Sequence, residues 1–136
     1  MRHLHAGQVT VRRFITAHDV GTIINPIGHQ GQIEGGLIQG LGYALMEEMK
    51  TEDGRVSTLS LGDVKLPTMQ DIPPLTTVLL QDQVGPGPFN AQAIGEGSIS
   101  AVAPAVANAV ADACGVRIVD LPITAEKVYF GLKGQK

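Results

Sequence analysis

The region from 30 to 50 combines the spacing of an amphipathic helix with more glycine than an isolated helix tolerates. Large apolar residues recur every four positions, at Ile33, Leu37, Leu41 and Leu45. Five glycines nevertheless lie within this region or at its start. Each interior glycine costs a helix up to about 1 kcal/mol relative to alanine. The sequence therefore predicts a helix over residues 30–50 whose backbone another group approaches closely.

One stripe of this predicted helix carries polar side chains beside glycines, which leave the backbone uncovered. It places two amide side chains on either side of two glycines, in the order Gln32, Gly35, Gly36 and Gln39. Gly31 stands just before the first amide. Close packing against a strand or a second helix would explain these glycines without a ligand. A bulky group lying against the backbone would explain them equally well.

A second helix is predicted where alanine occupies every odd position from 101 to 113. As a helix, this region gathers its valines on one stripe and its polar residues on the opposite one. We expect it to begin or kink at Pro104 and to end at Gly115. Thr124 is expected to cap a last helix over residues 125–132, with Glu126 in its first turn.

Four short regions read as strands, over residues 8–16, 56–61, 76–81 and 116–119. With the helices, they predict a single α+β domain over residues 1–136. The expected architecture is a two-layer α/β sandwich, in which two long helices, near 30–49 and 98–114, pack on a small mixed sheet.

Composition and charge exclude several classes of protein. The chain has 136 residues and a net charge of −3, and its basic residues are scattered, so we expect no nucleic-acid partner. The lone Cys114 excludes an internal disulfide and an iron–sulfur cluster ligated by this chain alone. The apolar region 99–119 is broken by polar residues and proline, so no membrane span is expected. Residues 1–7 lack the apolar stretch of a signal peptide, and we expect a cytoplasmic protein.

The long loop over residues 82–97 ends in Gly95-Glu96-Gly97-Ser98. A carboxylate at a helix start can simply favour the helix dipole. Enclosed in a pocket, Glu96 would instead have a raised pKa and could act as a general base. The pattern Gly95-x-Gly97-x-x-Ser100 half-matches a dinucleotide-binding fingerprint but lacks its third glycine. No histidine spacing predicts a metal site.

Several motifs together resemble the molybdenum hydroxylase family, which includes xanthine dehydrogenase, aldehyde oxidase and carbon monoxide dehydrogenase. The first part of the resemblance rests on Asp19-Val-Gly-Thr-Ile-Ile-Asn25-Pro26 and Gly31-Gln32-Ile-Glu-Gly35-Gly36. The second rests on Ala-Ile-Gly95-Glu96-Gly97-Ser98 before the alanine-rich helix, and on Leu121-Pro-Ile-Thr-Ala-Glu126-Lys-Val. The motifs follow one another in the family's order, and they correspond to the C-terminal part of its molybdopterin-binding domain.

The resemblance implies roles for individual residues. Glu96 corresponds to the family's catalytic base, and Gln32 to a glutamine that hydrogen-bonds the molybdopterin cofactor near the metal. Further cofactor-binding positions implied by the same cleft are Gly31, Gly35, Gly95, Gly97, Asp19 and Asn25. No protein side chain of this chain is expected to ligate the metal.

The implied function is that of a fragment or split subunit of a molybdopterin-dependent oxidoreductase. Such enzymes hydroxylate an aldehyde, a heteroaromatic or a related carbon centre with water. The expected partners are the rest of the molybdenum-binding subunit and iron–sulfur and flavin modules, with self-association of the isolated chain. Alone, the chain is expected to be inactive and not to retain the cofactor. The alternative is a catalytically inactive remnant or interaction domain without metal.

Overall fold

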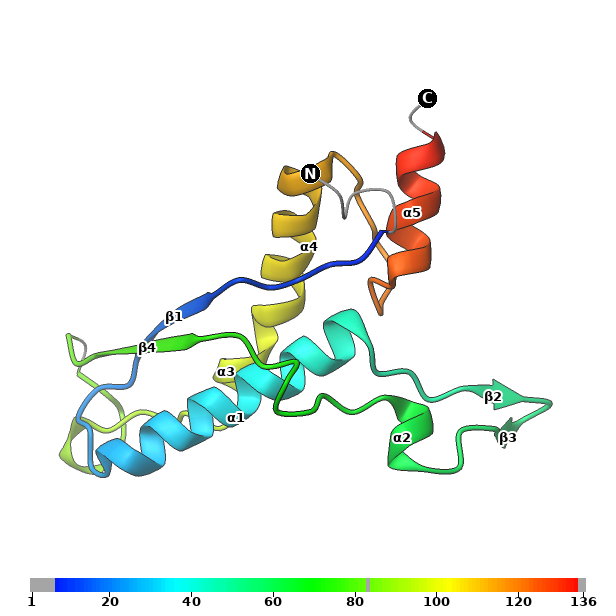
Figure 1. Ribbon diagram of the computed structural model, residues 1–136. Helices are drawn as coiled ribbons and strands as arrows, with labels where there is room; N and C mark the ends of the chain where they lie inside the picture. Colours follow the sequence, from blue (N-terminus) through cyan, green and yellow to red (C-terminus); the bar gives the residue numbers. More distant parts are fainter. Residues whose placement is uncertain (1–6, 83, 135–136) are drawn as a thin grey trace.

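The computed structural model describes residues 7–82 and 84–134. Its elements follow in the order β1 (Phe14–Asp19), α1 (Pro26–Leu45), β2 (Thr51–Glu52), β3 (Arg55–Val56), α2 (Leu61–Val64), β4 (Leu75–Leu80), the 3-10 turn η2 (Pro88–Asn90), α3 (Gly97–Ser100), α4 (Val102–Cys114) and α5 (Ala125–Gly134) (Figure 1). The predicted α+β class is confirmed. Of the interpretation of residues 1–7 as lacking a signal peptide, only Gly7 lies within the described residues.

The first long helix, α1, begins earlier than the periodicity indicates. Asn25 caps it, because its side-chain Oδ1 accepts a hydrogen bond of 3.0 Å from the backbone N–H of Gly28. Pro26 is the first helical residue, a position where its missing N–H costs nothing. Asn25 and Pro26 together therefore form the start of the helix. The helix ends at Leu45 rather than at 50.

The second predicted helix forms as two pieces, α3 and α4, separated at Ala101. Pro104 has no N–H to donate to the carbonyl of Ser100, which accounts for the interruption at this point. The predicted end is confirmed, because Gly115 closes α4 in the left-handed conformation with φ of 76°.

The core forms where α1 packs on α3 and α4. Leu37 and Ala44 of α1 are fully buried, and Val102, Val106 and Val110 of α4 pack against the same helix face. By length and composition alone, the stretch Gly97–Cys114 could cross a membrane, with a mean hydropathy of 1.2. Val102, Val106 and Val110 of this stretch belong to the core.

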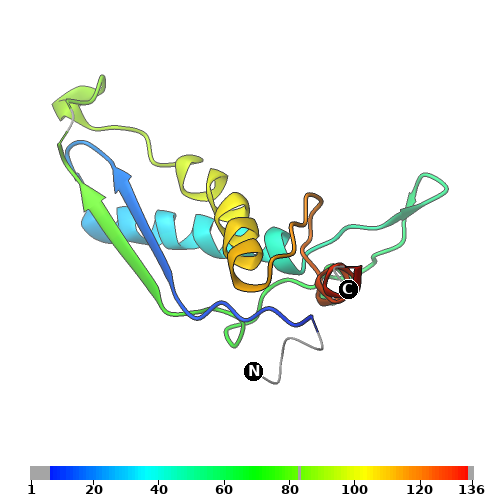
Figure 2. The same cartoon turned by 90° about the horizontal axis from the view of Figure 1, so that it is seen from above.

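The strands form two separate two-stranded ladders rather than one mixed sheet. β1 and β4 pair in parallel, with Phe14 opposite Leu75 and Asp19 opposite Leu80. The ladder lies over the first half of α1, and β4 contacts that helix (Figures 1 and 2). β2 and β3 form an antiparallel hairpin that projects away from the rest of the fold (Figure 1).

Three of the predicted strands differ from the structure. Of residues 8–16, only residues 14–16 belong to β1, because no strand among the described residues pairs with residues 8–13. Of residues 56–61, only Val56 belongs to a strand, although the N–H of Ser57 still donates to the carbonyl of Lys50 at 2.9 Å. Helix α2 begins at Leu61 behind a Ser60 capping box. Residues 116–119 form no strand. The predicted strand over 76–81 is confirmed as β4.

The last helix, α5, begins where the sequence predicts. The hydroxyl of Thr124 accepts a hydrogen bond of 3.3 Å from the backbone N–H of Lys127, and Glu126 lies in the first turn. The helix continues to Gly134, two residues beyond the predicted end.

Candidate functional site

Two loops that are far apart in the sequence are joined beside the N-terminus of α1. The backbone N–H of Thr22 donates to the carbonyl of Asn90 at 3.1 Å. The N–H of Gln92 donates in turn to the carbonyl of Val20, also at 3.1 Å. Gly21 sits between them with φ of 58°, and a Cβ there would stand 2.2 Å from the Asn90 carbonyl oxygen. This contact fixes where the loop that carries Glu96 passes α1.

The side chain of Gln32 holds that loop directly against the helix. Its Nε2 donates a hydrogen bond of 3.2 Å to the carbonyl of Gly95, although the two residues are 63 positions apart. The hydroxyl of Ser98 donates to the same carbonyl at 3.4 Å. Gly95, the residue immediately before Glu96, therefore accepts hydrogen bonds from side chains of both α1 and α3.

Gly36 makes this contact possible. A Cβ at Gly36 would stand only 2.0 Å from the Ser98 hydroxyl oxygen, and Ser98 itself is 4% exposed. One turn later, a Cβ at Gly40 would stand 2.6 Å from the Cβ of Val102. The close-packing explanation of the glycine-rich helix is thus correct for these two glycines.

The other glycines of the predicted site face open space. At Gly31, Gly35, Gly95 and Gly97, no described atom beyond the local backbone lies within 4 Å of the position of a Cβ. All four are exposed. They belong to the two segments that the Gln32 hydrogen bond joins, so bare backbone is presented on both sides of that bond. Nothing among the described residues requires glycine at these four positions.

Glu96 stands at the N-terminus of α3, but its side chain makes no capping hydrogen bond. The carboxylate is exposed and has no hydrogen-bond or ion-pair partner among residues 7–82 and 84–134. Capping of the following helix therefore does not occupy this carboxylate. A cleft shared by the side chains of Gln32 and Glu96 stays a prediction.

Asp19 and Asn25 have local roles in the structure. The Asp19 Oδ1 accepts a hydrogen bond of 3.2 Å from the N–H of Gly21, which closes the turn after β1. Asn25 caps α1. Both residues lie on the β1–α1 connection that contacts the Glu96 loop. Their role toward a cofactor stays a prediction.

Sequence reasoning missed two residues that support this arrangement. Ser98 was noted only as part of the Gly-Glu-Gly-Ser motif, yet it is buried against Gly36. Tyr43 was not singled out, and its hydroxyl donates to the carbonyl of Ile99 at 3.2 Å. The only sequence feature that could indicate a packing role for Ser98 is its small size, which suits contact with a helix glycine. No sequence pattern indicates the role of Tyr43.

Comparison with known proteins shows that the chain is similar to a part of several molybdenum-binding subunits. Residues 3–73 match the molybdopterin cofactor-binding domain family. The xanthine dehydrogenase molybdenum-binding subunit of Escherichia coli O157:H7 is 39% identical over 124 residues, which cover 90% of this chain and 16% of that protein. The aldehyde oxidoreductase molybdenum-binding subunit PaoC of Escherichia coli K12 is 35% identical over 130 residues, or 93% of this chain and 18% of that protein.

A solved structure shows the same fold. The aldehyde oxidoreductase from Desulfovibrio gigas superposes with a TM-score of 0.86 at 35% identity, over 96% of this chain and 14% of that one. The chain thus spans less than a fifth of the length of the relatives that it matches. Sequence match, superposed fold and the order of the motifs agree, and this chain belongs to the molybdenum hydroxylase family, as a segment of its molybdopterin-binding domain.

Proposed function

We propose that this chain forms one wall of the active site of a molybdenum hydroxylase, in which Glu96 is the general base and Gln32 contacts the cofactor. The observation that carries the proposal is the hydrogen bond from Gln32 Nε2 to the Gly95 carbonyl. It joins the glutamine that would bind the cofactor to the turn that bears the base. The Glu96 side chain on that turn is exposed and does not cap the following helix.

The residues present fit a bulky pterin. Four glycines offer bare backbone with open space before it, on either side of Gln32. Backbone without side chains lets a large planar ligand lie close to peptide N–H and C=O groups. The Gln32 amide uses one N–H on Gly95 and keeps a second N–H and its oxygen for a ligand.

Glu96 has the chemistry that hydroxylation with water requires. A bound molybdenum cofactor supplies the two-electron oxidation of the substrate carbon. The carboxylate of Glu96 takes a proton from the oxygen that is transferred to that carbon, which makes the oxygen a better nucleophile. Free of hydrogen bonds from the described residues, the carboxylate is available for that proton.

The partners that we propose are the rest of a molybdenum-binding subunit and, through it, iron–sulfur and flavin modules. Large apolar side chains stay exposed across the fold, at Ile27, Leu59, Met69, Val84, Phe89 and Val119, each more than 80% exposed. Exposed apolar surface of this extent is typical of a protein segment that is covered by the rest of a larger protein. In the isolated chain, the same surface would drive self-association. Alone, the chain offers too few donors to hold the cofactor against the entropy lost on binding.

The test is a chimera in which this chain replaces the matching stretch of the Escherichia coli O157:H7 xanthine dehydrogenase subunit. Glu96→Gln in the chimera should lower kcat by about 100-fold to 10,000-fold, because the amide keeps the shape but cannot take a proton. Its molybdenum content, measured by elemental analysis, should match that of the parent chimera. Near-parental turnover would remove Glu96 from the mechanism.

Gln32→Ala tests the cofactor wall in the same chimera. We expect a lower molybdenum and pterin content, because the cofactor loses its amide contact and the Gly95 turn loses its fastening. Gln39→Ala is the matched control, since Gln39 is an exposed glutamine two turns later on the same helix. Equal losses in both variants, or none in either, would contradict the role of Gln32.

A further inference from the structure

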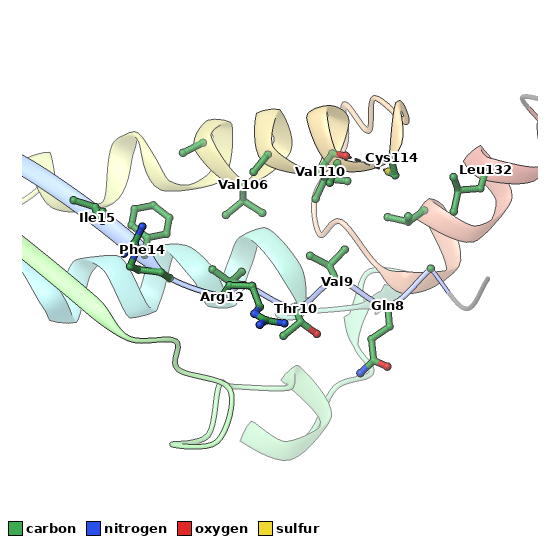
Figure 3. Close-up of a pocket in the computed structure, with 17 residues that line it drawn as sticks. Gln8, Val9, Thr10, Arg12, Phe14, Ile15, Val106, Val110, Cys114 and Leu132 are labelled. Atoms are coloured by element: carbon green, nitrogen blue, oxygen red, sulfur yellow. Dashed lines mark hydrogen bonds between the residues drawn. The ribbon is translucent and has the colours of Figure 1, made fainter. Parts of the chain in front are cut away.

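A groove unrelated to the Gln32–Glu96 site lies at the other end of the helices. It has a volume of about 660 Å³ and runs between residues 7–15 and the faces of α4 and α5. Apolar side chains dominate its walls, among them Val9, Val106, Val110, Cys114 and Leu132. Val106 and Val110 point from α4 toward the extended segment of residues 8–13 (Figure 3). On that segment, the side chains of Gln8, Thr10 and Arg12 point away from α4.

The segment over residues 8–13 is extended and pairs with no other strand among residues 7–82 and 84–134. It leads into β1, and its backbone pairing starts only at Phe14, whose N–H donates to the Pro74 carbonyl at 3.0 Å. No backbone N–H or C=O of residues 8–13 is hydrogen-bonded to another described residue. Backbone N–H and C=O groups that become buried under other protein are nearly always hydrogen-bonded. The unpaired groups of residues 8–13 are therefore suited to pairing with an added strand.

Both ends of the segment are nevertheless held in position. Gly7 is buried against the start of α5, where a Cβ would stand 1.9 Å from the Ala125 carbonyl oxygen. At the other end the segment continues into the β1–β4 ladder. An edge that is fixed at both ends loses little further entropy when a strand pairs with it.

The charge beside the groove and the small side chains of α4 indicate which kind of segment could bind in the groove. Arg13 is exposed and forms no ion pair among the described residues, which favours an acidic side chain in the partner. The groove face of α4 carries Ala105, Ala109 and Ala113, which allow a backbone to come close. In the relatives, more than four-fifths of the molybdenum-binding subunit lies outside the stretch that this chain matches.

From these observations we infer that the groove receives an extended, apolar segment with an acidic flank from the rest of the molybdenum-binding subunit, paired as a strand with residues 8–13. This inference rests on the proposed function for the identity of the partner. Beyond the proposed function, it identifies the groove as the surface that this partner contacts and strand pairing as the way in which the partner is recognised.

Hydrogen exchange tests the pairing. The probe is the Escherichia coli O157:H7 subunit expressed without its matching stretch, mixed with this 136-residue chain. Amides of residues 9–13 should exchange fast in the chain alone and about tenfold slower or more in the mixture. Unchanged exchange at these amides in a formed complex would overturn the inference. So would protection that rises with the concentration of the chain alone, because the occupant would then be a second copy.

Ala109→Asp places a charge in the groove and should weaken association about tenfold or more, with loss of the amide protection. Asn108→Asp adds the same charge to the same helix outside the groove, next to Arg117, and should associate like the parent. Arg13→Glu lies on the exposed segment, where it cannot disturb the core, and should weaken association most at low salt. Association unaffected by Ala109→Asp and Arg13→Glu would overturn the inference.

Glu96→Gln separates this inference from the proposed function. That variant should dock and protect residues 9–13 like the parent, although its chimera loses turnover. Retained turnover with docking intact would refute only the catalytic proposal. Lost turnover with no protection at residues 9–13 would refute only the docking site.

Discussion

The two faces of α1 use the same residue for opposite purposes. On the inward face, Gly36 and Gly40 leave room for Ser98 and Val102, and a methyl group at either position would overlap a neighbour. On the outward face, Gly31 and Gly35 have nothing before them among the described residues. Packing within this chain explains the first pair and does not explain the second. A glycine that its own fold does not need indicates something outside the chain.

The sharpest stability contrast along α1 is between its buried and exposed large side chains. Leu37 is fully buried, and Leu37→Ala should lower the free energy of unfolding by about 2–5 kcal/mol through lost burial and a residual cavity. Ile27 in the first turn is 86% exposed, and Ile27→Ala should change the stability by about 0.5 kcal/mol or less. Urea unfolding followed by circular dichroism measures both, and similar effects would mean that the two faces are not distinct in the isolated chain.

The glycine pair gives a contrast of sign rather than size. Gly40→Ala should destabilise the chain by about 1–3 kcal/mol, because the new methyl group collides with Val102. Gly35→Ala should stabilise it by up to about 1 kcal/mol, because alanine favours a helix and the space is open. The same unfolding experiment applies. A loss of stability in both variants would contradict an open outer face.

A third and smaller effect lies away from α1, before α5. The side-chain ammonium of Lys127 hydrogen-bonds and ion-pairs with the Asp120 carboxylate, and the hydrogen bond above all lowers the pKa of that carboxyl below its usual 3.8. A lowered folded-state pKa stabilises the fold above the unfolded value and loses that contribution as the pH falls below 3.8. Asp120→Asn should therefore cause a slight loss of stability at neutral pH that disappears in acid. Thermal unfolding from pH 7 to pH 3 would detect it, and a difference that grows in acid would contradict the sign.

Periodicity predicted the elements that depend on their own residues. The alanine pattern of α4, the stop at Gly115 and the cap at Thr124 are local features, and all three are confirmed. Residues 8–13 show why strands are harder. Their alternation is that of a strand, but a strand also needs a neighbour, and among the described residues pairing with β4 begins only at Phe14.

The site shows the same division. Only the family resemblance and the glycine stripe indicate Glu96 and Gln32, because no spacing rule joins residues that are more than 60 positions apart. The local roles of Asp19 and Asn25 in a turn and a cap could have been read from their residue types. The interruption at Ala101 follows from Pro104, and only the expectation of a start or kink near that residue anticipated it.

The parallel pairing of β1 and β4 also bears on the order in which this chain folds. Phe14 and Leu75 are 61 positions apart, and the intervening residues include all of α1. Closing so long a loop carries a large entropic cost before any contact stabilises it. The glycines of α1 make that helix a poor autonomous nucleus, whereas the alanine-rich α4 can form early. We therefore expect α4 to have the highest φ-values in the transition state, with the ladder closing last.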